Sequence, residues 1–238
     1  MRKITGLICI VLLSACANSP FYDKNKVPER ADRSSINQLA KTDFDRMADM
    51  EYSNNVDSLR RLMVKLYKRN PRELAKSTTD SAEKMAEWVF EGSDQHYWRF
   101  ENIHRKQDIE AIFLTFDDKF QGDRVLSFIV GLQTMLAKAH DNKTEFYLTD
   151  NLDPQRIYNV SRNFEIAAWK LSNSVDAHGN LYLLSNEIND KDRNLSFERE
   201  FGKIIGRTDF YATALAEKSQ RLISRVAQSL ATAVFLPF

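Results

Sequence analysis

Apolar residues recur at intervals of three and four positions along most of the chain, and charged or amide side chains fill the positions between them. This spacing places the apolar residues on one face of an α-helix. Two such segments, residues 36–47 and 56–67, lie on either side of the polar Ser53, Asn54 and Asn55. The pattern therefore predicts a helical hairpin with its turn at these three residues.

Two Asx-Pro pairs mark the beginnings of further helices. In residues 70–73 (Asn-Pro-Arg-Glu) the asparagine can cap a helix, the proline fits its first position, and the glutamate can reach back to the free amides. Asp153-Pro154 has the same arrangement and opens an apolar pattern that continues to Val175. We expect one helix to begin at each pair.

The most apolar helix is predicted over residues 125–139. Its apolar side chains cover too much of the circumference for a surface helix, so we expect it at the centre of the fold. Gly131 in its middle would let a neighbouring helix approach closely. Gly122 separates this helix from the apolar segment before it, and Gly92 and Gly179 are expected at helix ends.

The rest of the chain is also mainly helical in pattern. Residues 197–205 read as a helix that breaks at Gly206, followed by a long helix over residues 207–230. Only residues 145–149 and 180–184 look extended, and both are short enough to be loops or single turns. The sequence predicts an all-α fold of about eight or nine helices in a single compact domain.

A different pattern occupies the N-terminus. Arg2 and Lys3 precede the apolar residues 4–15, which are too few to cross the roughly 30 Å hydrocarbon core of a bilayer and are typical of a cleavable signal peptide. The run ends in Leu-Ser-Ala-Cys at positions 13–16, which resembles the lipobox of bacterial lipoproteins. The resemblance implies that Cys16 is acylated, for example with palmitate, and becomes the new N-terminus.

The chain then divides into a signal peptide (1–15), a lipidated flexible tether (16–34) and the helical domain (35–238). The tether is rich in proline and charge, so we expect it to be extended. Cys16 is followed by Ala17, not by the aspartate that retains lipoproteins in the inner membrane of enteric-type bacteria. The resemblance therefore favours anchoring at the periplasmic face of the outer membrane over the inner membrane.

Composition excludes several kinds of chemistry. The chain's two cysteines are Cys9, within the signal peptide, and Cys16, so the mature domain has no thiol for a disulfide or for cysteine catalysis. Loss of Arg2 and Lys3 with the signal peptide removes two positive charges and changes the formal net charge from +1 to −1. A near-neutral domain gives no reason to expect a nucleic-acid partner.

The histidines do not form a recognisable metal motif. His96, His104, His140 and His178 are scattered, with neither His-Glu-x-x-His nor His-x-His spacing. His96, His104 and Asp108 could share one helix face as a metal site, but ordinary polar surface residues are the favoured interpretation. We predict no metal and no cofactor.

No catalytic residue can be assigned from the sequence. The Gly-x-Ser-x-Gly motif of serine hydrolases is absent. A helical lytic transglycosylase needs an acid with a raised pKa in an apolar cleft, and Glu87 or Glu91, beside Trp88 and Phe90, could serve. The chain does not match that family further, because no glutamate is followed by serine.

Two clusters are candidate binding surfaces. The first comprises Trp88, Tyr97, Trp98 and Phe100 around the polar residues 92–96, an arrangement typical of a glycan platform or of a protein hot spot. The alternative, which we favour, is that these aromatic residues pack into the core.

The second cluster is a basic stripe of five residues at helical spacing that could contact anionic lipid head groups or phosphates. A solvated helix face is the favoured alternative. The stripe comprises Arg61, Lys65, Lys68, Arg69 and Arg72.

The apolar end of the chain, Ala-Val-Phe-Leu-Pro-Phe, is expected to dock into a groove of its own domain, with docking to another molecule as the alternative. An aromatic last residue is common in outer-membrane barrels, but the chain lacks their alternating strands. Residues 197–207 resemble helical lipoproteins of Gram-negative envelopes, a resemblance that implies no particular activity.

These observations predict a lipid-anchored periplasmic binding or scaffold protein of the bacterial envelope. Its expected partners are the membrane, through the lipid anchor, and another envelope protein, with peptidoglycan as a further possibility. The alternative function is a peptidoglycan-acting enzyme or an activator of one. A purely architectural lipoprotein without a defined ligand is the third option.

Overall fold

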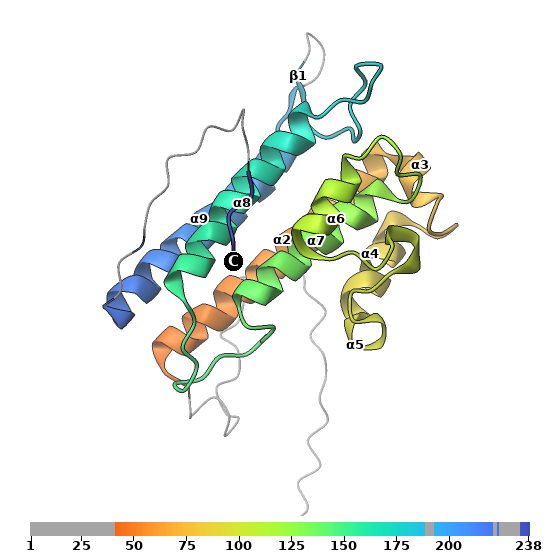
Figure 1. Ribbon diagram of the computed structural model, residues 1–238. Helices are drawn as coiled ribbons and strands as arrows, with labels where there is room; N and C mark the ends of the chain where they lie inside the picture. Colours follow the sequence, from red (N-terminus) through yellow and green to blue (C-terminus); the bar gives the residue numbers. More distant parts are fainter. Residues whose placement is uncertain (1–40, 189–192, 221–222, 224–233) are drawn as a thin grey trace, which may run out of the picture. The chain divides into compact units, whose positions relative to one another are not determined.

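A computed structural model describes residues 41–188, 193–220, 223 and 234–238. In these residues the chain forms eight α-helices, one short 3-10 helix and one pair of two-residue antiparallel strands (Figure 1). The predicted all-α fold is therefore confirmed. The elements are α2 (Asp43–Arg69), α3 (Pro71–Leu74), α4 (Ala82–Glu91), α5 (Ser93–His96), η1 (Glu101–Ile103), α6 (Asp108–Thr115), α7 (Arg124–Ala139), α8 (Pro154–Asn173), β1 (Glu187–Ile188), β2 (Arg193–Asn194) and α9 (Ser196–Ser219).

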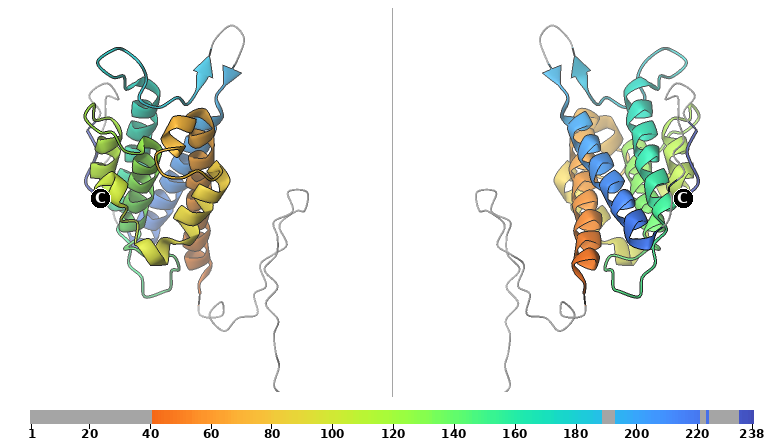
Figure 2. Two further views of the ribbon diagram at one scale, coloured as in Figure 1. Left: turned by 90° about the vertical axis from the view of Figure 1, so that its right-hand side faces the viewer. Right: turned by 90° about the vertical axis from the view of Figure 1, so that its left-hand side faces the viewer.

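The four long helices pack in a closed ring, in which α2 contacts α9, α9 contacts α8, α8 contacts α7, and α7 contacts α2. Figure 2 shows these helices side by side from two directions. The short helix α6 lies against α7, and α4 lies against α2. The apolar faces of the helices thus enclose one core.

Helix α7 is central, as its sequence predicts. Thirteen of its 16 residues are buried. A side chain at Gly131 would place its Cβ 2.6 Å from Cγ1 of Ile112 and 2.8 Å from the carbonyl oxygen of Asp108, both on α6. Because such distances are shorter than any normal contact, only glycine allows α6 to lie this close to α7.

The predicted hairpin before residue 70 is wrong, because α2 is a single continuous helix of 27 residues. The polar residues that suggested a turn lie inside it. Asn55 is fully buried, and its side-chain amide donates hydrogen bonds to Glu51 and to Thr208 of α9. The polar interruption is therefore a contact between two helices.

The predicted break at Gly206 is also wrong, since α9 continues through this residue. One glycine costs a helix only about 1 kcal/mol relative to alanine. The buried side chains of Phe201, Ile204, Thr208 and Tyr211 hold α9 against the bundle on both sides of the glycine. The predicted continuation to residue 230 lies outside the described residues.

The helix start at Asp153-Pro154 is confirmed. The Asp153 side chain accepts a hydrogen bond from the backbone N–H of Gln155, and Pro154 occupies the first turn of α8. The helix ends at Asn173, two residues earlier than the pattern predicts. Gly179 lies beyond this end in a separate turn, with a positive φ of 81°.

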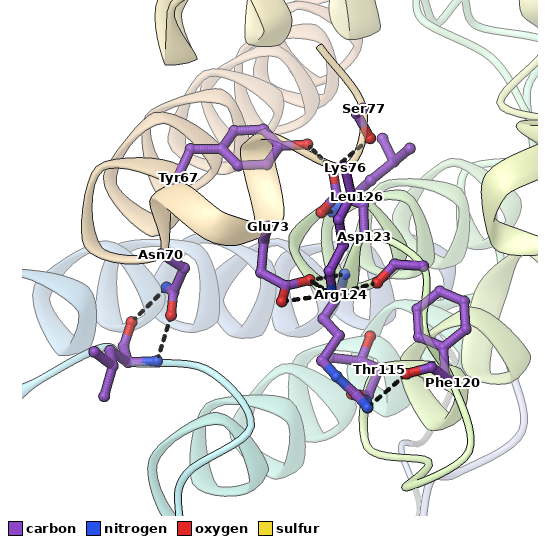
Figure 3. Close-up of polar contacts among 12 residues, drawn as sticks. Tyr67, Asn70, Glu73, Lys76, Ser77, Thr115, Phe120, Asp123, Arg124 and Leu126 are labelled. Atoms are coloured by element: carbon purple, nitrogen blue, oxygen red, sulfur yellow. Dashed lines mark hydrogen bonds and ion pairs between the residues drawn. The ribbon is translucent and has the colours of Figure 1, made fainter. Parts of the chain in front are cut away.

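The other Asx-Pro pair begins α3, but the predicted caps are wrong. The Asn70 side chain makes no capping bond and instead bridges the Leu66 carbonyl and the Leu184 backbone. Glu73 accepts a hydrogen bond from the backbone N–H of Arg124 at 2.7 Å (Figure 3). Both side chains therefore connect α3 to distant parts of the chain.

Two smaller predictions have clear outcomes. Gly92 ends α4, as expected, and its N–H donates to the Trp88 carbonyl. Residues 145–149 and 180–184 form loops and turns, except for one isolated bridge between Val175 and Leu181.

The end of the chain docks onto its own domain, as the sequence predicts. Phe235 is only 8% exposed and contacts the Phe113 ring of α6 edge-on. Asn163 of α8 exchanges two hydrogen bonds with the backbone of Leu236, at 2.8 and 2.6 Å. Residues 234–238 thus form a short strap beside α6 and α8 (Figure 2).

Candidate functional site

A cleft of about 710 Å³ opens between α5 with the turn after it, the beginning of α6 and the C-terminal half of α7. Three aromatic residues line it: Tyr52, Tyr97 and Trp98. We call this space the aromatic cleft. Its polar lining residues are Ser93, Asp94, Arg99, Gln107, Asp108, Thr134, Lys138, Asn142 and Thr144.

An unusual backbone presents two of these aromatic residues. Tyr97 and Trp98 have positive φ values of 51° and 58°, a conformation that bulky side chains rarely adopt. His96 holds this turn, because its Nδ1 accepts the backbone N–H of Trp98 at 3.0 Å. Its Nε2 lies 3.1 Å from the Val89 carbonyl of α4, so the proton of the neutral ring is on Nε2. Burial lowers the pKa of His96, which favours this neutral form.

The four aromatic residues of the predicted binding surface occupy different environments. Phe100 is 5% exposed and belongs to the core, whereas Tyr97 is 70% exposed. Trp98 is half-buried against Phe90 and also lines the cleft. Trp88 is half-exposed but does not line the cleft. Phe100 is therefore a core residue and Tyr97 a surface residue, whereas Trp88 and Trp98 are partly exposed.

Tyr52 of α2 is a buried residue that contributes to the lining of the cleft. Its side chain is 6% exposed, and its hydroxyl accepts a hydrogen bond from the Gln133 side-chain amide at 3.3 Å. Burial raises the pKa of Tyr52 to about 12, so the hydroxyl keeps its proton at neutral pH. With the Gln133 amide nitrogen as the donor, no described residue accepts this proton, and because Tyr52 lines the cleft a ligand there can accept it.

Charged side chains of both signs line the cleft. Lys138 forms an ion pair with Asp108 at 3.0 Å, and the backbone N–H of Asp108 donates to the Thr134 hydroxyl at 2.7 Å. The side chains of Asp94 and Arg99 have no hydrogen-bond or ion-pair partner within the described part of the chain. The two aspartates and two cations balance in charge.

A second, more open cleft of about 580 Å³ also includes Asp108 and Lys138 in its lining. Its other walls include Arg105 and the end of the chain at Phe238. The Lys138 ammonium lies 5.0 Å from the centre of the Phe238 ring. The strap at the end of the chain thus reaches the far side of the Asp108–Lys138 ion pair.

The predicted basic stripe is largely engaged within the domain. Four of its five cations contact acidic side chains or carbonyl oxygens, and Arg72 alone has no partner among the described residues. The contacts are Arg61 with Glu200 (3.2 Å), Lys65 with the Ser196 carbonyl (3.2 Å), Lys68 with Glu83 (2.5 Å) and Arg69 with Glu187 (2.7 Å).

The three residues considered as a metal site, His96, His104 and Asp108, do not share a helix face. His96 lies in α5, His104 follows η1, and Asp108 begins α6. The interpretation as one helix was wrong, because left-handed residues after His96 and at His104 turn the chain. In the described ranges, no group of three or more His, Cys, Asp or Glu residues is placed to hold a metal ion.

The acids considered for catalysis are exposed. Glu87 is exposed, and Glu91 pairs with Arg60 at 2.9 Å on the surface. A buried carboxylate that the sequence did not single out is Asp123, whose pKa is raised by burial.

Asp123 is held by the fold (Figure 3). It accepts hydrogen bonds from the hydroxyls of Tyr67 and Ser77 at 2.7 and 2.6 Å, and from the backbone N–H of Leu126 at 2.9 Å. These bonds cap α7 and occupy both carboxylate oxygens. We therefore interpret Asp123 as a structural residue.

Sequence reasoning also missed a second buried polar group, which we call the His140 cluster. It comprises Glu51, Asn55, His140 and Thr208. Glu51 contacts His140 Nε2 at 2.9 Å and accepts from the Thr208 hydroxyl at 2.9 Å. His140 Nδ1 lies 2.8 Å from the Leu136 carbonyl. The cluster connects α2, the C-terminal end of α7 and α9, and no short sequence motif predicts it.

Comparisons with known proteins give no match to a protein-family model, to a curated protein or to a solved structure. Among residues 41–188 and 193–220, no helix is long and apolar enough to cross a membrane.

Proposed function

We propose that this chain is a lipid-anchored binding or scaffold protein of the bacterial envelope that holds its ligand in the aromatic cleft. The observation that carries the proposal is the cleft itself, where Tyr97 and Trp98 stand beside polar side chains that have no internal partner. Its volume lies within the range of about 300–1,000 Å³ that is usual for ligand sites. Ligand sites usually combine aromatic walls with polar groups that orient the ligand, and this cleft has three aromatic and nine polar lining residues, so it suits a polar ligand.

The anchoring part of the proposal rests on the sequence of residues 1–34. The lipobox at positions 13–16 supports acylation of Cys16, and Ala17 supports sorting to the periplasmic face of the outer membrane. Two or three acyl chains would bind the membrane stably, whereas one gives only marginal binding. The tether at 17–34 would then allow the domain to reach a ligand away from the bilayer.

Replacing the acceptor tests this anchoring. We expect Cys16→Ala to abolish labelling by a fatty-acid probe, and to release the domain from the membrane or leave an unprocessed precursor. Cys9→Ala, in the part of the signal peptide that is removed, is the matched control and should label normally. Undiminished labelling of Cys16→Ala would contradict the proposal.

Binding is favoured over catalysis by the state of the carboxylates in the cleft. Asp108 is paired with Lys138, Asp94 is exposed to solvent, and the acids considered for transglycosylase chemistry, Glu87 and Glu91, do not line the cleft. A role in peptidoglycan metabolism therefore has its best support as recognition without bond cleavage.

Site-specific crosslinking tests whether the cleft is the binding surface. A photo-reactive amino acid is placed at Tyr97 in the lipidated protein in living cells. Phe210 is the control position, because it is also aromatic and 65% exposed but lies on α9 outside the cleft. We expect a discrete crosslinked product from position 97 that is absent from position 210. The same product from both positions, or from position 210 alone, would contradict the proposal.

A further inference from the structure

We infer that the ligand of the aromatic cleft is a glycan that contains N-acetylated amino sugars. This inference rests on the proposed function and names its ligand class. The first observation is the exposure of the two aromatic side chains, since Tyr97 is 70% exposed and Trp98 is only half-buried. Sugar rings have one face of C–H groups that packs on an aromatic ring, while their hydroxyls remain at the edge for hydrogen bonds.

The polar lining fits a neutral ligand with many hydroxyls. Ser93, Asp94, Asn142 and Thr144 have side chains without internal partners in the described part of the chain. Together they offer carboxylate and amide acceptors, amide donors, and hydroxyls that both donate and accept. Sugar hydroxyls also donate and accept, so they can satisfy such a mixed set.

The charges argue against a polyanion. Asp94 and Asp108 offset Arg99 and Lys138, so the four charged side chains of the cleft sum to zero. A phosphate-rich ligand would require an excess of cations. A neutral or weakly charged saccharide does not require an excess of cations.

Tyr52, in the lining of the cleft, favours a ligand with an acetamido group. The Tyr52 hydroxyl already accepts from Gln133, so its own proton is free to donate. A buried donor without an acceptor is costly, and an amide carbonyl is a strong acceptor. The carbonyl oxygen of an N-acetyl group can take this bond, whereas a plain hydroxyl at the same sugar position is a weaker acceptor.

The test uses the full-length lipidated protein in detergent, with Trp fluorescence and calorimetry as readouts. The probes are chitotetraose, which carries four acetamido groups, and cellotetraose, which has the same linkage with hydroxyls in their place. We expect chitotetraose to bind at least tenfold more tightly than cellotetraose. Equal binding of the two sugars would overturn the inference.

Three variants connect this preference to the cleft. We expect Tyr97→Ala to weaken chitotetraose binding by about thirtyfold, as for a typical aromatic hot spot. Tyr52→Phe, which removes only the hydroxyl, should reduce the preference for chitotetraose about tenfold while cellotetraose binding stays unchanged. Phe210→Ala is the matched control and should bind normally. An unaltered affinity in Tyr97→Ala would overturn the inference.

A last comparison distinguishes the sources of such sugars. Purified peptidoglycan sacculi carry N-acetylated amino sugars, whereas the amino sugars of lipopolysaccharide carry long acyl chains and phosphates, and cosedimentation with each tells which one the lipidated protein binds. Binding to sacculi that is lost in Tyr97→Ala supports the inference, and binding to lipopolysaccharide alone would overturn it. If neither these materials nor chitotetraose binds, while crosslinking from position 97 still gives its discrete product, the glycan inference fails and the proposed function stands.

Discussion

In the His140 cluster, Glu51 contacts the imidazole of His140, the hydroxyl of Thr208 and the amide of Asn55, and all four side chains are bonded inside the domain. In the aromatic cleft, by contrast, the side chain of Asp94 has no partner among the described residues. Both regions lie at the C-terminal half of α7.

The difference between them has a physical basis. A buried polar group without a hydrogen bond costs about 1–3 kcal/mol, so polar groups in the interior must be paired. Side chains that line an open cleft are hydrated and can exchange water for a ligand at little cost. Complete internal pairing is therefore typical of a structural cluster, whereas unpaired lining residues leave their polar atoms available to a ligand.

The largest expected effect comes from a substitution that disrupts the His140 cluster. His140→Ala leaves the carboxylate of Glu51, which is 5% exposed, without its imidazole partner in the interior. Removing one partner of such a buried pair costs about 3–5 kcal/mol of unfolding free energy. Urea denaturation measures the loss. His178→Ala, at an exposed position, is the control and should stay within about 0.5 kcal/mol of wild type. A midpoint of His140→Ala equal to that of wild type would show that the cluster is not structural.

Trp98 packs against the hydrophobic core and also lines the cleft, so its replacement should affect both stability and binding. Because Trp98 is only half-buried, Trp98→Ala should cost about 2 kcal/mol, roughly half of the value for a fully buried tryptophan, and should also weaken ligand binding. Thermal unfolding and the oligosaccharide titration measure the two effects. Tyr97→Ala should weaken binding with almost no change in melting temperature. If the two variants lost the same stability, the division of the aromatic cluster proposed here would be wrong.

Gly131 tests how closely the wall of the cleft depends on core packing. In Gly131→Ala the new Cβ meets the Asp108 carbonyl and Ile112 of α6, so α6 must move, at an expected cost of about 1–2 kcal/mol. This movement shifts Asp108 in the cleft and should also weaken binding. Gly206→Ala is the matched control, because its Cβ meets no atom within 4 Å, and it should stabilise α9 by up to about 1 kcal/mol. Equal melting temperatures of the two variants would contradict the close approach of α6 and α7.

The smallest expected effect is a pH dependence at His96. Burial lowers the pKa of His96 in the folded protein below its usual value of 6.5. Its stabilising contribution is therefore complete above that usual value and is lost as the pH falls through the lowered pKa. Protonation also removes the acceptor for the Trp98 N–H.

Fluorescence measures this change most directly. Between about pH 7.5 and pH 5 we expect the tryptophan emission to shift and the melting temperature to fall, because the turn that presents Tyr97 and Trp98 loosens. His96→Gln should lack this component, whereas His178→Gln should retain it. A pH profile of His96→Gln that matches wild type would rule out His96 as its source.

Local signals in the sequence identified much of the fold. The apolar positions placed α7 at the centre, and Asp153 with Pro154 marked the first turn of α8. Such signals are reliable because a cap or a proline acts within one helical turn. The same local view failed at Asn55, whose role depends on Thr208, 153 positions further along the chain. A polar residue in an apolar pattern looks like a turn until its distant partner is known.

The candidate site shows the same division. The density of aromatic residues marked Tyr97 and Trp98 in the sequence, because these residues are neighbours in the chain. Nothing local marked Tyr52, Thr134 or Asn142, which reach the same cleft from other elements. The sequence alone determined which segments are helical, because helix periodicity arises from contacts three or four positions apart. Only the tertiary structure decided which side chains share the cleft and which polar groups are paired, because both depend on how helices distant in sequence pack against one another.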